Sequence, residues 1–219
     1  PAPAGSTWKQ LSTGAGAERR RRLLGALAGN LAATAREVRD LWEPEKGNYL
    51  ADFRRGRPEF DAPFPEKVSL DDLINQVIAH TEVIGDLRLG RPLGIRASPR
   101  GEPAASPLES RASGRSLDDL LDSLEGIALL YRGAPAGGVG LSARVRAASP
   151  EIDRAIEAAL QKAAAGLRAI PAPLGESVAR QHQAVHDAVT NLDELHSRLA
   201  VDLASIYQTR VTVINFDGD

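Results

Sequence analysis

The sequence predicts an all-α protein built as a bundle of about five helices. Three observations support this fold class. Apolar residues recur with helical spacing in several long segments, and Ser, Gly and Pro stand where those segments begin and end. Aromatic residues make up only 4% of the chain, so the core must consist mainly of Leu, Ile, Val and Ala. That composition favours packed helices over sheets.

The N-terminal part is expected to start with a flexible lead-in over residues 1–16, followed by one helical domain over residues 17–219. A helix is predicted over residues 17–42, because its apolar residues lie at spacings of four, four, seven and three. Residues 44–68 contain four prolines, which predict a loop. We expect this loop to be ordered, because aromatic rings can pin it onto the bundle. These rings belong to Tyr49, Phe53, Phe60 and Phe64.

Two helices with matching start signals follow. Ser69 and Ser116 each have an aspartate three residues later, which is typical of an N-cap with an acidic partner in the first turn. The first of these helices is expected to end at Gly90 and the second at Gly133. Residues 91–115 lie between them and are rich in Pro, Gly, Ser and Arg, so they are predicted to form a loop.

The C-terminal part is predicted to contain two more helices. Ser149 followed by Pro150 indicates a capped helix start with proline in the first helical position. Residues 174–206 are predicted to form the longest helix, with an extended tail at residues 211–219. The apolar seam of that long helix has alternating spacings of four and three, which is typical of shallow-angle bundle packing. The seam residues are Val178, His182, Val185, Val189, Leu192, His196, Leu199, Leu203 and Ile206.

The composition excludes several classes of function. The formal net charge is −2, which speaks against a nucleic-acid partner. The chain has no cysteine, so disulfides, thiolate metal sites and cysteine nucleophiles are excluded. No apolar run approaches the ~20 residues that span a bilayer. The sequence begins with Pro and contains no Met, so we expect a processed chain or part of a longer one.

Two loop segments, residues 88–94 and 109–116, concentrate charge and glycine between strong helices. Arginine matches carboxylates and phosphates in paired hydrogen bonds, and the second segment leads into a helix N-terminus that attracts anions. An anion-binding site is therefore one interpretation. The other is that these arginines pair with neighbouring acids and only fix the loops. The candidate binding residues are Arg91, Glu109, Ser110, Ser113 and Arg115.

Histidines and terminal acids supply further candidates. His182 and His186 are spaced i, i+4, as metal ligands on one side of a helix often are. His182 lies on the apolar seam, however, where a histidine bonded to a neighbour is ordinary, and the H-E-x-x-H pattern is absent. His80 and His196 are interpreted as structural. Two carboxylates, Asp217 and Asp219, flank Gly218 and suit either cation binding or a solvated terminus.

Three segments together resemble motifs of the imelysin-like family. Residues 88–94 resemble its K-L-G-R-P-L-G stretch, with Arg88 where lysine is common. Residues 109–126 are similar to its E-S-x-x-S-G-R-S-L-x-D stretch and the L-E-G that follows. Residues 211–219 resemble its terminal V-x-F-x-x-x-D-G-D in a shortened form. The matches belong to the family's second half.

The resemblance implies a fold of two helical-bundle halves, of which this chain is the C-terminal one. It implies an exported location, in the periplasm or at the outer membrane, and a link to bacterial iron uptake, with iron as the implied cofactor. The implied partners are the N-terminal half of the same protein and iron-uptake components of the envelope. The family is classed among metallopeptidases, but its G-x-H-x-x-E signature belongs to the first half. No histidine here has Gly two residues before it and Glu three residues after it.

Three hypotheses about function follow. The chain is a ligand- or iron-binding module, or half of a metallopeptidase whose signature lies on the other half, or a structural helical adaptor. The first hypothesis predicts that the charged loop residues gather on the face that meets the other half, together with Asp217 and Asp219. The second predicts that the chain cleaves no peptide by itself. The third predicts that the loop arginines are dispensable for binding.

Overall fold

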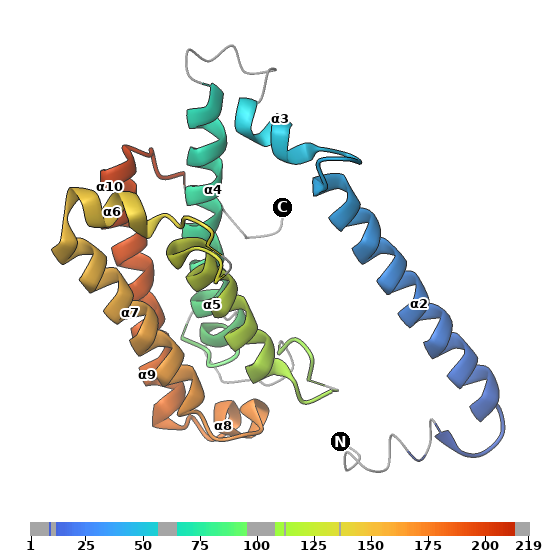
Figure 1. The fold of residues 1–219 in the computed structure, drawn as a ribbon. Coiled ribbons are helices and arrows are strands. Elements are labelled where there is room, and N and C mark those ends of the chain that lie inside the picture. Colours follow the sequence, from blue (N-terminus) through green and yellow to red (C-terminus); the bar gives the residue numbers. More distant parts are fainter. Residues whose placement is uncertain are drawn as a thin grey trace. The chain divides into compact units, whose positions relative to one another are not determined.

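The computed structural model of the chain describes residue 9 and residues 12–56, 65–95, 108–111, 113–135 and 137–212. Every regular element in these ranges is a helix, which confirms the predicted all-α class (Figure 1). The chain divides into two compact units, an N-terminal unit (Pro1–Ser69) and a C-terminal unit (Leu70–Asp219). Each unit is described by itself below.

The N-terminal unit contains α2 (Ala17–Trp42), which has the predicted bounds, and the shorter α3 (Tyr49–Arg55). Between them the chain turns back at Gly47, where a Cβ atom would lie 2.6 Å from the Leu41 backbone, so only glycine fits. The Trp42 ring packs edge-on against Tyr49, with centroids 4.9 Å apart. The predicted loop over 44–68 is therefore wrong in part, since it contains α3 and the start of the next helix. Phe60 and Phe64 lie outside the described residues.

The next helix, α4 (Pro65–Glu82), begins earlier than predicted and continues as the π-helix η1 (Val83–Gly90). The prediction that Ser69 caps this helix is wrong, because Ser69 is buried inside α4. The described part of α4 begins at Pro65, four residues before Ser69. The predicted end near Gly90 is confirmed.

Three helices follow: α5 (Ser116–Arg132), α6 (Ser142–Ala148) and α7 (Pro150–Arg168). The predicted cap at Ser116 is wrong, since its hydroxyl donates to the carbonyl of Glu109. The predicted cap at Ser149 is confirmed, because its Oγ accepts from the amide of Ile152 at 3.3 Å. The helix α6 was not predicted, since so short a segment carries little periodic signal.

The predicted single helix over residues 174–206 is wrong. It is divided into α8 (Leu174–Ala179), α9 (Gln183–Arg198), the π-helix η2 (Leu199–Leu203) and α10 (Ala204–Tyr207). Gln181 takes a left-handed conformation with φ 49°, and His182 is extended, which ends one helix and starts the next. The Nδ1 atom of His182 accepts from the amide of Ala184 at 3.2 Å and caps α9. The longest described helix is therefore α2.

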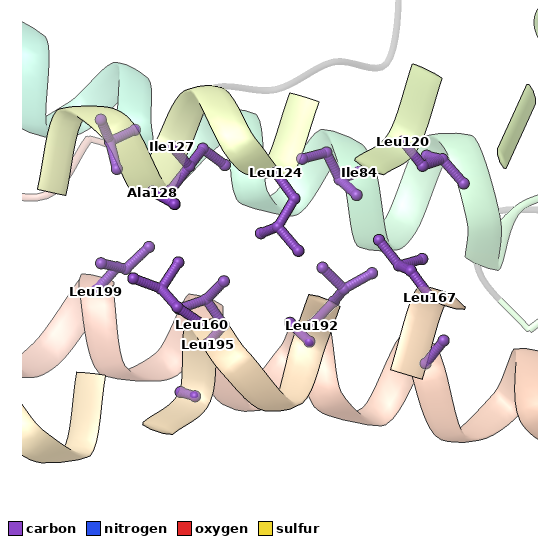
Figure 2. Packing of buried hydrophobic residues seen from close by; sticks show 14 of the residues in the cluster. Ile84, Leu120, Leu124, Ile127, Ala128, Leu160, Leu167, Leu192, Leu195 and Leu199 are labelled. Atoms are coloured by element: carbon purple, nitrogen blue, oxygen red, sulfur yellow. The ribbon is translucent and has the colours of Figure 1, made fainter. Parts of the chain in front are cut away.

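The core of the C-terminal unit lies between α7 and α9 on one side and α5 and η1 on the other (Figure 2). In Figure 2, Leu124, Ile127 and Ala128 of α5 face leucines of α7 and α9. The seam predicted over the last helices packs into this core despite the break. Its fully buried members are Val178, Val185, Val189, Leu192, Leu199 and Leu203.

A buried polar contact ties three helices of this unit together. The Tyr131 hydroxyl of α5 donates to Oδ1 of Asp153 on α7 at 2.9 Å, and Arg146 Nε of α6 donates to Oδ2 at 2.7 Å. Burial, and then the hydrogen bond to Asp153, raise the pKa of Tyr131 well above its ordinary value. The tyrosine therefore stays a neutral donor at physiological pH.

Candidate functional site

The π-helix η1 and the turn after it present two arginines, Arg88 and Arg91. The wider turn is visible in the backbone, where the amide of Arg91 donates to the carbonyl of Asp86, five residues back, at 2.6 Å. Two buried leucines, Leu89 and Leu93, anchor this segment in the core. Because π-helical turns change the direction of the side chains that follow, they are frequent at functional sites.

The Arg88 side chain joins η1 to α5 and to the segment before α5. Its Nη1 atom donates to Oγ of Ser123 at 2.7 Å, and its Nε atom lies 2.8 Å from Oε2 of Glu109. The Arg88 side chain is only 13% exposed, whereas that of Glu109 is 62% exposed. Glu109 therefore covers a largely buried guanidinium from the solvent side. The Arg88 guanidinium also lowers the pKa of His80, after burial as the larger cause.

Both arginines have a buried N–H donor that makes no hydrogen bond. The Nε atoms of Arg88 and Arg91 are inaccessible to solvent and have no hydrogen-bond partner among the residues that the structure describes. The Nε of Arg88 is close to Glu109 but is not aligned with it, so that pair is an ion contact without a proper hydrogen bond. Buried donors normally find partners, and exceptions call for an explanation such as a missing ligand.

The segment before α5 is held in a tight turn that fixes Glu109. Ser110 has a left-handed backbone with φ 51°, and its carbonyl accepts from the Ser113 hydroxyl at 2.9 Å and from the Gly114 amide at 3.0 Å. The Ser116 hydroxyl donates to the Glu109 carbonyl. Ser110 and Ser113 thus shape the turn, while Glu109 reaches from it to Arg88.

Arg115 points to a different set of partners. It lies within 3.6 to 3.9 Å of carboxylates of Asp118, Asp119 and Asp122 on α5, and its side chain is 58% exposed. Such long, exposed ion pairs contribute little to stability. The structure therefore connects Glu109 with Arg88, and no described contact joins Arg115 to that pair. Asp217 and Asp219 lie outside the described residues.

The histidine candidates lie elsewhere. His182 is exposed and caps α9, so the interpretation of this histidine as part of an apolar seam is wrong. It precedes α9 and does not share a helix face with His186. The Nδ1 atom of His196 lies 3.3 Å from the Ile78 carbonyl, as expected of a structural histidine. In the part of the chain that the structure describes, no three His, Asp or Glu residues are grouped to hold a metal ion.

Sequence reasoning missed Ser123 and did not rank Arg88 among the binding residues. Ser123 belongs to no recognised motif, and its hydroxyl also donates to the Asp119 carbonyl of its own helix at 2.7 Å. Its spacing of seven residues from Ser116 places both hydroxyls on one side of α5, but that spacing does not indicate a contact with an arginine of another element. Arg88 was visible only as part of the charged segment 88–94.

These features define an all-helical bundle protein in which Arg88 of a π-helix contacts Ser123 of α5 and Glu109 of the segment before it. A model of the imelysin family, peptidase family M75, matches residues 6–199, and the chain belongs to the imelysin family. A comparison with curated proteins gave no significant match. No helix in the described ranges has the length and apolar character needed to cross a membrane.

A solved structure supports the same fold. The chain is similar to the crystal structure of an imelysin peptidase from Bacteroides ovatus, with a TM-score of 0.62 and 24% sequence identity. The match covers 72% of this chain and 44% of that chain. At this level of identity the likeness concerns the fold. The chain spans less than half the length of the protein that it matches.

Proposed function

We propose that this chain is a non-catalytic, ligand-binding module of an imelysin protein that serves iron uptake at the bacterial cell envelope. The observation that carries the proposal is the pair of buried Nε–H donors of Arg88 and Arg91, which make no hydrogen bond with any described residue. Two guanidinium groups on one turn suit a ligand with several carboxylates, because arginine binds carboxylates in a forked geometry. A ferric chelate with carboxylate arms has this chemistry.

Glu109 has a defined part in this proposal. Its carboxylate occupies the position beside Arg88 that a ligand carboxylate would take, and its exposed side chain is free to move aside. The tight turn at residues 108–111 holds only its backbone. Ligand binding then replaces a misaligned ion contact by aligned hydrogen bonds, which is favourable at a largely buried guanidinium.

The test is calorimetric titration of the 219-residue chain with ferric citrate, and with citrate alone. The change is Arg91→Ala, and we expect it to raise the Kd for ferric citrate by about tenfold or more, the usual effect of losing a charge-assisted hydrogen bond. Urea unfolding should change by less than about 0.5 kcal/mol, because the Arg91 Nε makes no hydrogen bond in the free protein. The matched control is Arg154→Ala, an exposed arginine on α7, which should alter neither quantity.

Two results would contradict the proposal. One is a wild-type chain that binds no ferric citrate up to about 1 mM, the weak end of specific affinity. The other is Arg91→Ala with unaltered binding and a large loss of stability, which would make the arginine a structural clamp. Tighter binding of citrate alone than of ferric citrate would instead assign the site to a carboxylate without iron.

The peptidase alternative is separated by incubating insulin with the purified chain and Zn²⁺ or Fe²⁺. The chain has no histidine in a G-x-H-x-x-E setting, so we expect intact insulin. Metal-dependent cleavage that co-purifies with the sequence-verified chain would replace the binding proposal by an enzymatic one.

A further inference from the structure

A groove runs between α5 and α7 of the C-terminal unit, and it shares no residue with the site around Arg88 and Arg91. Its volume is about 220 Å³, which is smaller than the roughly 300–1,000 Å³ of sites for drug-sized ligands. Both helices contribute aliphatic side chains to its floor and polar or charged side chains to its rims. The floor consists of Leu121, Leu124, Ala128, Leu160 and Ala164, and the rims of Glu125, Arg132, Gln161 and Arg168.

The floor of the groove is apolar because it is the outer side of the hydrophobic core. Leu124, Ala128 and Leu160 are buried members of that core, and Leu121 and Ala164 are partly buried against it. The alanine side chain ends at Cβ, so Ala128 and Ala164 leave open the space that longer side chains would fill. Water in this space gains no hydrogen bond from the floor, and an apolar chain that displaces it is therefore favoured.

The charged groups at one end of the groove already have partners. Arg132 makes a forked pair with Glu157 of α7, with its Nε atom 2.9 Å from Oε2 and its Nη2 atom 2.5 Å from Oε1. The amide of Gln161 donates to the same carboxylate at 2.9 Å. The hydrogen bond to Glu157, and to a smaller degree the charge of Glu125, raise the pKa of Arg132. This end of the groove therefore offers a ligand no unpaired positive charge.

Arg168 supplies the charge at the other end. In Figure 2, Ala128 of α5 lies opposite Leu160 of α7. Leu120 and Leu167 lie opposite each other further along, so α5 and α7 run in opposite directions. Arg168 follows Leu167 and thus lies at the end of the groove away from the ion pair of Arg132. Its side chain is exposed and makes no hydrogen bond or ion pair with any residue that the structure describes.

The length of the groove sets the size of a linear ligand. The axis of α7 rises by about 12 Å from Leu160 to Arg168, at ~1.5 Å per residue. An extended chain of single bonds advances by about 1.2 Å per bond, so roughly ten bonds cover this distance. A fatty acid of medium length has these dimensions.

We propose that this groove binds a linear monocarboxylate of the medium-chain fatty acid type. The carboxylate lies at Arg168, whose guanidinium offers it a forked pair of N–H donors. The alkyl chain follows the apolar floor toward Ala128. A cationic head group would be repelled by Arg168, and a second anionic group at the far end would meet Glu125 and Glu157. This inference is independent of the function proposed above.

The test is calorimetric titration of the 219-residue chain with hexanoate, octanoate, decanoate and dodecanoate. We expect one ligand per chain and a gain in affinity of about fourfold for each added methylene up to decanoate. From decanoate to dodecanoate the gain should fall below about twofold per methylene, because the longer chain extends beyond the groove. The neutral probe is 1-octanol, which has the same tail length as octanoate without the charge.

Two variants separate the head of the ligand from its tail. Arg168→Gln should weaken the binding of octanoate by about fivefold or more and change that of 1-octanol by less than about twofold, because only the carboxylate needs the cation. Ala164→Leu should weaken both ligands by about tenfold or more, because the larger side chain fills the groove. The matched control is Arg154→Gln, an exposed arginine on α7 outside the groove, which should alter neither affinity. Circular dichroism should be unchanged in all three variants.

Three results would overturn the proposal. The first is a wild-type chain that binds no octanoate up to about 5 mM, beyond the weak end of specific affinity. The second is an equal effect of Arg168→Gln and Arg154→Gln on octanoate, which would place the carboxylate elsewhere on the chain. The third is unaltered binding of octanoate to a natively folded Ala164→Leu chain, which would show that the tail does not occupy the groove.

Discussion

At the residue scale, Asp153 is a buried polar group that joins three helices of the C-terminal unit. It is 8% exposed and accepts hydrogen bonds from Tyr131 and Arg146. We expect Asp153→Ala to lower the free energy of unfolding by about 1–3 kcal/mol, because the Tyr131 hydroxyl would be left buried without an acceptor. Urea unfolding at pH 7, followed by circular dichroism, measures this change.

The control for this prediction is Arg146→Ala. The Arg146 side chain is 66% exposed, so its ion pair with Asp153 should contribute little to stability. The expected order is therefore a large loss for Asp153→Ala and a small one for Arg146→Ala. Equal losses for the two variants would mean that the ion pair, and not the buried tyrosine contact, stabilises the junction of α5, α6 and α7.

Single residues also mark the limit of sequence analysis. The charged segment 109–116 was predicted as a site because of its residue types, and the structure connects its Glu109 to Arg88. The hydroxyl of Ser123 was missed, because a serine within an amphipathic helix gives no sign that an arginine from another element meets it. The assignment of Ser116 as an N-cap failed for a related reason, since its hydroxyl has a competing acceptor seven residues back. Contacts between distant segments decide such roles, and local spacing does not encode them.

At the scale of elements, α9 supplies the best test of the core. Leu192 is 1% exposed. A Cβ atom added at Gly85 of η1 would lie 3.4 Å from the Cβ atom of Leu192, so α9 and η1 pack closely there. Leu192→Ala should therefore cost about 2–5 kcal/mol of stability, because it opens a cavity that the backbone cannot fill. The measurement is urea unfolding. Val201→Ala, at a position 65% exposed, should stay within about 0.5 kcal/mol of the wild type.

The elements differ in how well the sequence predicted them. Helical periodicity located α2, α5, α7 and most of the seam in α9, because burial of one face imposes a 3.6-residue repeat on the sequence. It failed at the break between α8 and α9, since Gln181 and His182 are compatible with a helix and carry no Gly or Pro signal. Local hydrogen bonds hold the left-handed turn there: the amide of His182 donates to the Ser177 carbonyl, and its Nδ1 atom accepts from the amide of Ala184. Periodicity also cannot separate a π-helix such as η1 from an α-helix.

At the scale of the whole molecule, the two units differ in how many of their apolar side chains are buried within the unit. The residues of the hydrophobic cluster of the C-terminal unit lie between Ile74 and Tyr207 and pack against one another. In the described part of the N-terminal unit, Ala17 is the only buried hydrophobic residue, and the large apolar side chains of α2 are exposed within this unit. The sequence predicted an apolar face on α2 correctly. It did not predict that the face has no partner within the described part of its own unit, because a repeat shows that a helix needs a partner but not where the partner is.

This difference predicts that a chain shortened to residues 65–219 folds by itself. It keeps α4 whole and retains every member of the hydrophobic cluster, so its free energy of unfolding should lie within about 1 kcal/mol of that of the full chain. The urea m-value should fall only slightly, because α2 is already exposed and adds little newly exposed surface on unfolding. Shortening at the other end, to residues 1–203, should instead cost about 3–5 kcal/mol, because it removes the buried Tyr207 and its hydrogen bond to the Leu141 carbonyl. A large loss in the 65–219 chain would show that the N-terminal unit contributes to the stability of the C-terminal one.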